Sequence, residues 1–158
     1  MANIFAGSEI VELGVQIEMN GYDFYNELAF KSKDKKIKDL FNFLAQEEQK
    51  HIKVFQEILD KAEKYEPPEA YTQEYFSYMK ALADNYVFTQ KGIGARIAKE
   101  IKSDTQAVNM GITFEKDSII FYDGIKKAVP EYDHKIVDQL IAQERNHIIK
   151  LLEIRKKG

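Results

Sequence analysis

The chain has 158 residues, a net charge of −3 and no cysteine, which excludes disulfides, thiolate zinc sites, Cys-ligated iron–sulfur clusters and a thiol nucleophile. A chain of this length is expected to form one domain, residues 1–158, that buries about two thirds of its surface. Lys and Glu are scattered, residues 1–10 lack a basic segment followed by an apolar run, and no run approaches ~18 apolar residues. We therefore expect a cytoplasmic protein that binds neither nucleic acid nor membranes.

The first half of the chain predicts two long helices. The first covers about residues 8–31, with Ser8 as its N-cap, and the second covers about residues 34–65, with Asp34 as its cap. A connection this short between long helices predicts an antiparallel hairpin. Pro67 and the proline after it end the second helix, because neither ring can donate a backbone hydrogen bond.

A long and less regular segment, residues 66–103, follows. It predicts a helix over about 71–85, a break at Gly92 and Gly94, and a short helix over about 95–102. A connection of this length can carry the chain along the whole bundle. The second and third long helices are therefore expected to run parallel.

The last part of the chain predicts two more long helices. The third covers about residues 104–129, with Asp104 as its cap, and Pro130 opens the fourth over about residues 131–156. The expected fold is all-α: a four-helix bundle with a long helical crossover between helices two and three.

Acids and imidazoles interrupt the apolar stripe of each long helix. Read at 3-and-4 spacing, these positions face the core although their side chains are polar. The six residues are Glu18, Glu48, His51, Glu115, Glu144 and His147. A buried carboxylate is several kcal/mol unfavourable unless it is paired, protonated or bound to a metal.

The two halves of the chain share a pattern. Glu18 and Tyr25 are separated by seven positions, as are Glu115 and Tyr122. Glu48 follows Glu18 by 30 residues and Glu144 follows Glu115 by 29, and a His lies three positions after each second Glu. The sequence therefore predicts two related hairpins that point their polar groups at a common centre.

This set of side chains suits two metal ions. Four Glu residues carry a charge of −4, which balances two divalent cations. We assign Glu18 and Glu115 as terminal ligands, Glu48 and Glu144 as bridges, and one nitrogen from each histidine. Oxygen and imidazole donors without sulfur favour two iron ions, with manganese or zinc as alternatives.

Further side chains are candidates for supporting roles. Metal-bound imidazoles usually donate their second nitrogen to an outer acceptor, and Glu47 and Gln143 each precede a bridging Glu. Tyr25 and Tyr122 lie two turns from the terminal acids on the same face. They are candidate catalytic residues that hydrogen-bond a carboxylate or lie beside the reacting oxygen species, and core packing is the alternative interpretation.

With these residues the chain resembles the ferritin-like di-iron carboxylate superfamily, which places a Glu on each of two helices and Glu-x-x-His on each of the other two. Within it the chain most resembles the rubrerythrin-like proteins. The resemblance implies a di-iron centre that reacts with peroxide or dioxygen. Full rubrerythrins add a rubredoxin domain with Cys-ligated iron and an extra Glu near the third-helix ligand. Here there is no cysteine and the flanking residues are Ile112 and Ser118, which is closer to bacterioferritin.

The resemblance implies an oxidoreductase that reduces peroxide, or dioxygen, with electrons from an external donor such as a rubredoxin-like protein. The alternatives are a ferroxidase or iron-storage protein, a di-iron oxygenase acting on an apolar substrate, and a helical interaction module. The last would use an aromatic run that otherwise covers the bundle: Tyr71, Tyr75, Phe76, Tyr78, Tyr86 and Phe88. A homodimer or higher homo-oligomer is expected.

Overall fold

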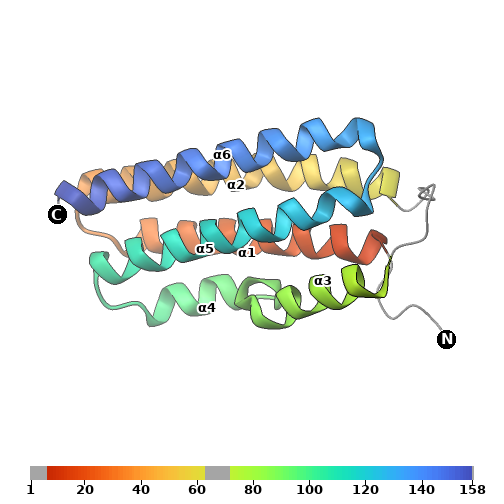
Figure 1. The fold of residues 1–158 in the computed structure, drawn as a ribbon. Coiled ribbons are helices and arrows are strands. Elements are labelled where there is room, and N and C mark those ends of the chain that lie inside the picture. Colours follow the sequence, from red (N-terminus) through yellow and green to blue (C-terminus); the bar gives the residue numbers. More distant parts are fainter. Residues whose placement is uncertain (1–6, 63–71, 158) are drawn as a thin grey trace.

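The computed structural model describes residues 7–62 and 72–157, which contain six α-helices and no strand. Four long helices form a bundle: α1 (Gly7–Lys31), α2 (Lys35–Ala62), α5 (Asp104–Ile125) and α6 (Glu131–Lys157). The crossover from α2 to α5 contains α3 (Gln73–Asn85), the 3-10 segment η1 (Val87–Thr89) and α4 (Ile93–Glu100). The predicted all-α four-helix bundle with a helical crossover is confirmed (Figure 1). No described helix is both long and apolar enough to cross a bilayer.

The four long helices make two antiparallel hairpins. In Figure 1, α1 and α2 run in opposite directions, as do α5 and α6, while α2 and α5 run in the same direction. The crossover produces this parallel arrangement, because it carries the chain back along the bundle. It also covers one face: α3 and α4 lie against the layer of α1 and α5, on the side away from α2 and α6 (Figure 1).

Two of the predicted helix caps are wrong. Helix α1 begins at Gly7, so Ser8 lies within its first turn. Helix α5 is capped by Ser103, whose Oγ accepts a hydrogen bond from the Gln106 N–H at 3.1 Å, and Asp104 is the first helical residue. Asp34 does cap α2, because its Oδ1 accepts from the Ile37 N–H at 3.1 Å.

Helix ends also differ from the prediction. The α-helical part of the third long helix ends at Ile125, and its last turn tightens into the 3-10 segment η2 (Lys126–Ala128). Val129 is then extended, as expected for the residue before a proline. The predicted end of the second helix at residue 65, the prolines at 67 and 68, and the predicted start of the next helix at 71 lie outside the described residues.

The crossover is attached to α1 by one buried amide. The Asn20 Nδ2 donates to the carbonyls of Phe88 and Gln90, both at 2.6 Å, and its Oδ1 accepts from the Gly94 N–H at 3.2 Å. Gly92 has a positive φ of 71° and forms the predicted break. The second predicted break is wrong: Gly94 lies inside α4, where a Cβ would come 2.0 Å from the Asn20 carbonyl oxygen.

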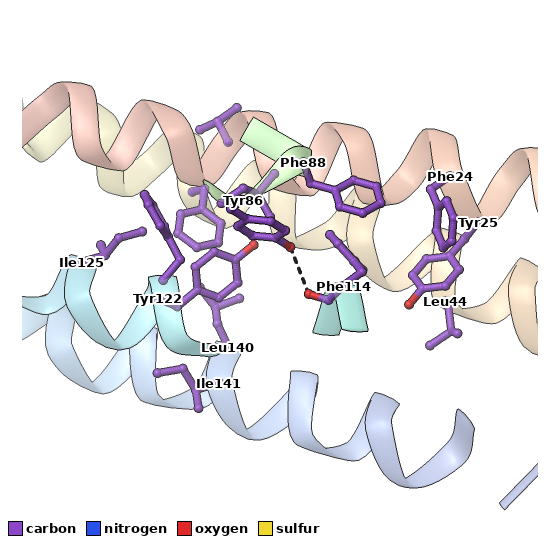
Figure 2. Close-up of a cluster of buried hydrophobic side chains, with 14 of the residues drawn as sticks. Phe24, Tyr25, Leu44, Tyr86, Phe88, Phe114, Tyr122, Ile125, Leu140 and Ile141 are labelled. Carbon is purple, nitrogen blue, oxygen red and sulfur yellow. Dashed lines mark hydrogen bonds between the residues drawn. The ribbon is translucent and has the colours of Figure 1, made fainter. Parts of the chain in front are cut away.

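The aromatic run of the crossover covers the bundle. Tyr75, Tyr86 and Phe88 are buried, whereas Tyr78 is half-exposed. The Tyr86 hydroxyl donates to the Phe114 carbonyl at 2.9 Å, the hydrogen bond drawn in Figure 2. The run therefore serves mainly to close the α1/α5 face. Its first predicted member, residue 71, lies outside the described part of the chain.

Candidate metal centre

The structure brings all six predicted polar residues together in the middle of the bundle. Each long helix contributes at least one of them, and the exposed fraction of every one is between 0% and 3%. The residues are Glu18 on α1, Glu48 and His51 on α2, Glu115 on α5, and Glu144 and His147 on α6. Their burial follows from the apolar stripes in which they lie, because each stripe faces the core.

The six residues form two overlapping groups. Ligand atoms from Glu18, Glu48, His51 and Glu144 lie within 4.8 Å of one another, and so do those from Glu48, Glu115, Glu144 and His147. Glu48 and Glu144 belong to both groups, which is the position that bridging ligands require. Each group offers three carboxylates and one imidazole, the donor set that iron, manganese and zinc accept.

The His51 ring turns one nitrogen toward the acids and the other away from them. Its Nδ1 lies 2.9 Å from Glu144 Oε1 and 3.5 Å from Glu18 Oε2. Its Nε2 lies 2.5 Å from Gln143 Oε1, so the amide oxygen fixes the orientation of the ring. Nδ1 is therefore the nitrogen available to a metal.

The His147 ring also turns Nδ1 toward the acids, but its Nε2 makes no hydrogen bond with the described residues. Its Nδ1 lies 3.4 Å from both Glu48 Oε1 and Glu115 Oε1, and its Nε2 lies 3.9 Å from Glu47 Oε1. The two imidazoles stack with ring centroids 5.9 Å apart. Each outer nitrogen thus faces a side chain of the opposite helix, Gln143 for His51 and Glu47 for His147.

The acids lack partners for most of their oxygen atoms. Six buried carboxylate oxygens accept no hydrogen bond of good geometry from the described residues: Oε2 of Glu18, Oε2 of Glu115, and both oxygens of Glu48 and Glu144. Carboxylates in a dry interior need a proton or a cation. The residues present therefore fit a metal centre by number, chemistry and unmet charge.

Protonation follows from the same crowding. Burial and the neighbouring charges of Glu144 and Glu18 raise the pKa of Glu48 well above its ordinary value, and burial and neighbouring acids do the same for Glu144. Burial alone would lower the pKa of His51, but Glu18 and Glu144 outweigh it and raise that pKa to about 11. Burial would raise the pKa of Glu18, yet the charge of His51 outweighs it and lowers that pKa. In the metal-free protein, protons on these side chains therefore offset the negative charge of the carboxylates.

Two tyrosines hold the terminal acids in a crossed arrangement. The Tyr25 hydroxyl donates to Glu115 Oε1 at 2.7 Å, and the Tyr122 hydroxyl donates to Glu18 Oε1 at 2.5 Å. Each tyrosine thus bonds the acid of the other hairpin, because α1 and α5 are antiparallel and carry the same seven-residue spacing. Burial and the nearby carboxylates raise the pKa of both phenols well above 10, so they keep their protons.

Gly21 lies beside the centre but was not among the site residues predicted from the sequence. A Cβ at Gly21 would lie 3.3 Å from Glu48 Oε2 and 2.5 Å from the Phe114 ring, so only glycine leaves both side chains in place. Its signal in the sequence is a glycine in the interior of a predicted helix, three positions after Glu18, where glycine costs stability and calls for a packing reason.

The centre is closed on one side and thinly covered on the other. Toward the crossover, Phe24, Phe88 and Phe114 form a buried aromatic wall, with the Phe88 and Phe114 ring centroids 4.6 Å apart (Figure 2). Toward α2 and α6 the cover is mixed: the side chain of Glu47 is 21% exposed, Gln143 is exposed, and the partly exposed Phe43 ring lies 6.3 Å from the His147 ring. The centre is therefore nearest to solvent along the seam between α2 and α6.

Comparisons with known proteins agree with this geometry. The sequence model of the family described as Rubrerythrin matches residues 9–155. Among solved structures, the fold is similar to that of a Thermotoga maritima protein described as a ferritin-like diiron-carboxylate protein, with a TM-score of 0.69 and 25% sequence identity over 99% of this chain and 98% of that one. A search of curated proteins found no match.

Proposed function

The chain belongs to the rubrerythrin family, and from that premise we propose that it is a di-iron carboxylate oxidoreductase that reduces peroxide, or dioxygen, with electrons from an external donor. One observation carries the proposal: four carboxylates and two imidazoles, all buried, form two overlapping groups that share two acids. Such a set holds two cations side by side. The Thermotoga maritima relative is described as a diiron-carboxylate protein, which supports iron as the metal.

The residues that would hold the ions are those of the two groups, with Glu48 and Glu144 shared between them. Two ferrous ions bound there would supply two electrons, which is the number that converts one peroxide and two protons into two waters. Manganese and zinc accept the same donors, but zinc cannot change its oxidation state. The redox proposal therefore requires iron or manganese.

The tyrosines orient the terminal ligands. By donating to Oε1 of Glu115 and Glu18, the hydroxyls of Tyr25 and Tyr122 leave Oε2 of each acid without a hydrogen-bond partner in the described structure. A hydrogen bond to a carboxylate also stabilises its ionised form, which is the form that binds a metal. We assign both tyrosines to positioning these acids beside the reacting centre.

The reactants reach the centre from the α2/α6 side in this proposal. The aromatic wall fills the side toward the crossover, whereas the cover at the seam includes two polar side chains that contact solvent, Glu47 and Gln143. Because residues 1–158 contain no cysteine to ligate a second iron centre, the proposed electron donor lies outside these residues, such as a rubredoxin-like carrier. A small oxidant fits this partly polar cover better than a large apolar one does.

Rapid mixing tests the proposal. The iron-loaded, reduced protein should be oxidised faster by peroxide than by an equal concentration of dioxygen. The Glu144→Gln variant should lose this reaction, and Glu153→Gln, at an exposed position on the same helix, should keep it. Oxidation by dioxygen at the same rate as by peroxide, or faster, would refute the peroxidase function.

A ferroxidase is the second candidate. Glu115 is flanked one turn away by buried Ile112 and Ser118, so these positions add no further acid to the six proposed ligands. The six-ligand set resembles the ferroxidase centre of bacterioferritin. Storage of oxidised iron needs a closed shell of many chains, so a sizing measurement that shows only a dimer would exclude storage. An oxygenase is disfavoured because Phe24, Phe88 and Phe114 fill the apolar side of the centre.

A further inference from the structure

The two metal groups differ in the side chain that lies behind each histidine. We infer that the group containing His147 binds a divalent metal more tightly and fills first, because the anionic Glu47 faces its outer nitrogen while the neutral Gln143 faces that of His51. The inference rests on the metal centre of the proposed function and adds an order of filling to it.

The comparison is between equivalent positions of the duplicated pattern. Glu47 precedes the shared acid Glu48 just as Gln143 precedes Glu144. Each outer side chain crosses the seam to the histidine of the opposite helix: Gln143 Oε1 lies 2.5 Å from His51 Nε2, and Glu47 Oε1 lies 3.9 Å from His147 Nε2. The ligand sets are otherwise alike, with three acids and one imidazole each. The two groups therefore differ mainly in the outer side chain, which is charged at Glu47 and neutral at Gln143.

Glu47 is placed so that its charge acts inward. One carboxylate oxygen points to His147, while the other lies 3.2 Å from Lys50 Nζ. The lysine side chain is 75% exposed, and an ion pair in that position is weak because water screens it. Most of the negative charge therefore remains effective toward the buried imidazole, whose own side chain is 1% exposed.

A carboxylate behind a metal-bound imidazole makes the ring a stronger ligand. The negative charge stabilises the cation on the far side of the ring, and it also favours the tautomer that keeps the proton on Nε2 and frees Nδ1. An amide oxygen orients the ring in the same way but adds no net charge. Removal of an outer hydrogen-bond partner typically lowers metal affinity about 10–100-fold. Glu47 makes no hydrogen bond to His147 and acts by its charge from 3.9 Å, so we expect the two groups to differ by the lower end of that range, about 10-fold.

Exchanging the two outer side chains tests the inference. Metal-free protein is titrated with Zn2+ and followed by calorimetry for the two affinities and by histidine NMR for the order in which the rings respond. In the wild type, the signal of His147 should change before that of His51, with affinities separated by about 10-fold. The Glu47→Gln variant should weaken the tighter step and bring the two steps together. The Gln143→Glu variant should tighten the weaker step.

The double exchange, Glu47→Gln with Gln143→Glu, should restore two separate steps in the opposite order, which no merely structural role of these residues would produce. Glu57→Gln, at an exposed position on the same helix, is the matched control and should titrate as the wild type does. The inference is overturned if His51 responds first, if both groups fill with equal affinity, or if Glu47→Gln leaves the tighter step unchanged. A protein that binds no metal overturns both the inference and the proposed function, whereas slow oxidation by peroxide with ordered filling overturns only the latter.

Discussion

Replacing Glu48 by Gln should move the stability of the metal-free and metal-loaded protein in opposite directions. Glu48 is wholly buried, and neither of its oxygens accepts a hydrogen bond of good geometry from the described residues. An unsatisfied buried polar group costs about 1–3 kcal/mol. The amide has the same shape, carries no charge and offers two N–H donors to the acids of the centre. We therefore expect metal-free Glu48→Gln to gain about 1–2 kcal/mol, or about 2–8 °C in melting temperature for a domain of this size.

The metal-loaded protein should respond in the opposite way. A metal present at 100 times its Kd stabilises the folded state by about 2.7 kcal/mol. Glu48 belongs to both ligand groups, so its replacement weakens both sites together. The stabilisation by metal should therefore fall below about 1 kcal/mol at the same metal concentration.

Thermal unfolding followed by circular dichroism measures both effects. Wild type, Glu48→Gln and the exposed control Glu57→Gln are compared with excess chelator and with excess Mn2+, which avoids oxidation during heating. The control should match the wild type in both conditions. The reasoning is refuted if metal-free Glu48→Gln melts below the wild type, or if Mn2+ stabilises the two proteins equally.

Three further outcomes are expected. Folding raises the pKa values of Glu48 and His51, so the native state binds more protons than the unfolded state. The metal-free protein should therefore lose stability as the pH rises from 6 to 9. A urea unfolding midpoint that rises over this range would contradict this. Tyr122→Phe removes the hydrogen bond to Glu18 and should weaken metal binding several-fold in calorimetry while the fold is kept; unchanged affinity would remove its positioning role. Tyr86→Phe should cost about 1 kcal/mol in urea unfolding and leave metal stoichiometry unchanged, and metal loss would show that the crossover supports the centre directly.

Much of the fold could be predicted from the spacing of apolar residues and from the residues that start and end helices. The apolar stripes predict the four long helices, and the length of the crossover predicts that α2 and α5 run parallel. The errors are at helix ends. Ser103 and Asp104 are both good capping residues. Ser103 is the N-cap because its backbone is extended, whereas Asp104 is already helical. Gly94 predicts a break, but it serves the close contact between α4 and α1, which only the packed structure reveals.

The sequence predicts which residues form the candidate site, but it does not by itself predict which of them hydrogen-bond to one another. Six polar residues in apolar stripes identify the cluster, since each must face the core. The partners of the tyrosines depend on the direction of α5 relative to α1. Tyr25 lies two turns, about 11 Å, along α1 from Glu18, and its hydroxyl donates instead to Glu115 on α5 at 2.7 Å. The duplicated seven-residue spacing, combined with antiparallel helices, would have given this crossing.

The metal content of the purified protein tests the central claim most directly. Metal-free protein is loaded anaerobically with ferrous iron, freed of unbound metal and analysed for iron per chain. The account predicts two ions per chain in the wild type, in line with the two ligand groups, and fewer than one in Glu48→Gln. A wild type that retains no metal, or a variant that still retains two ions, would contradict it.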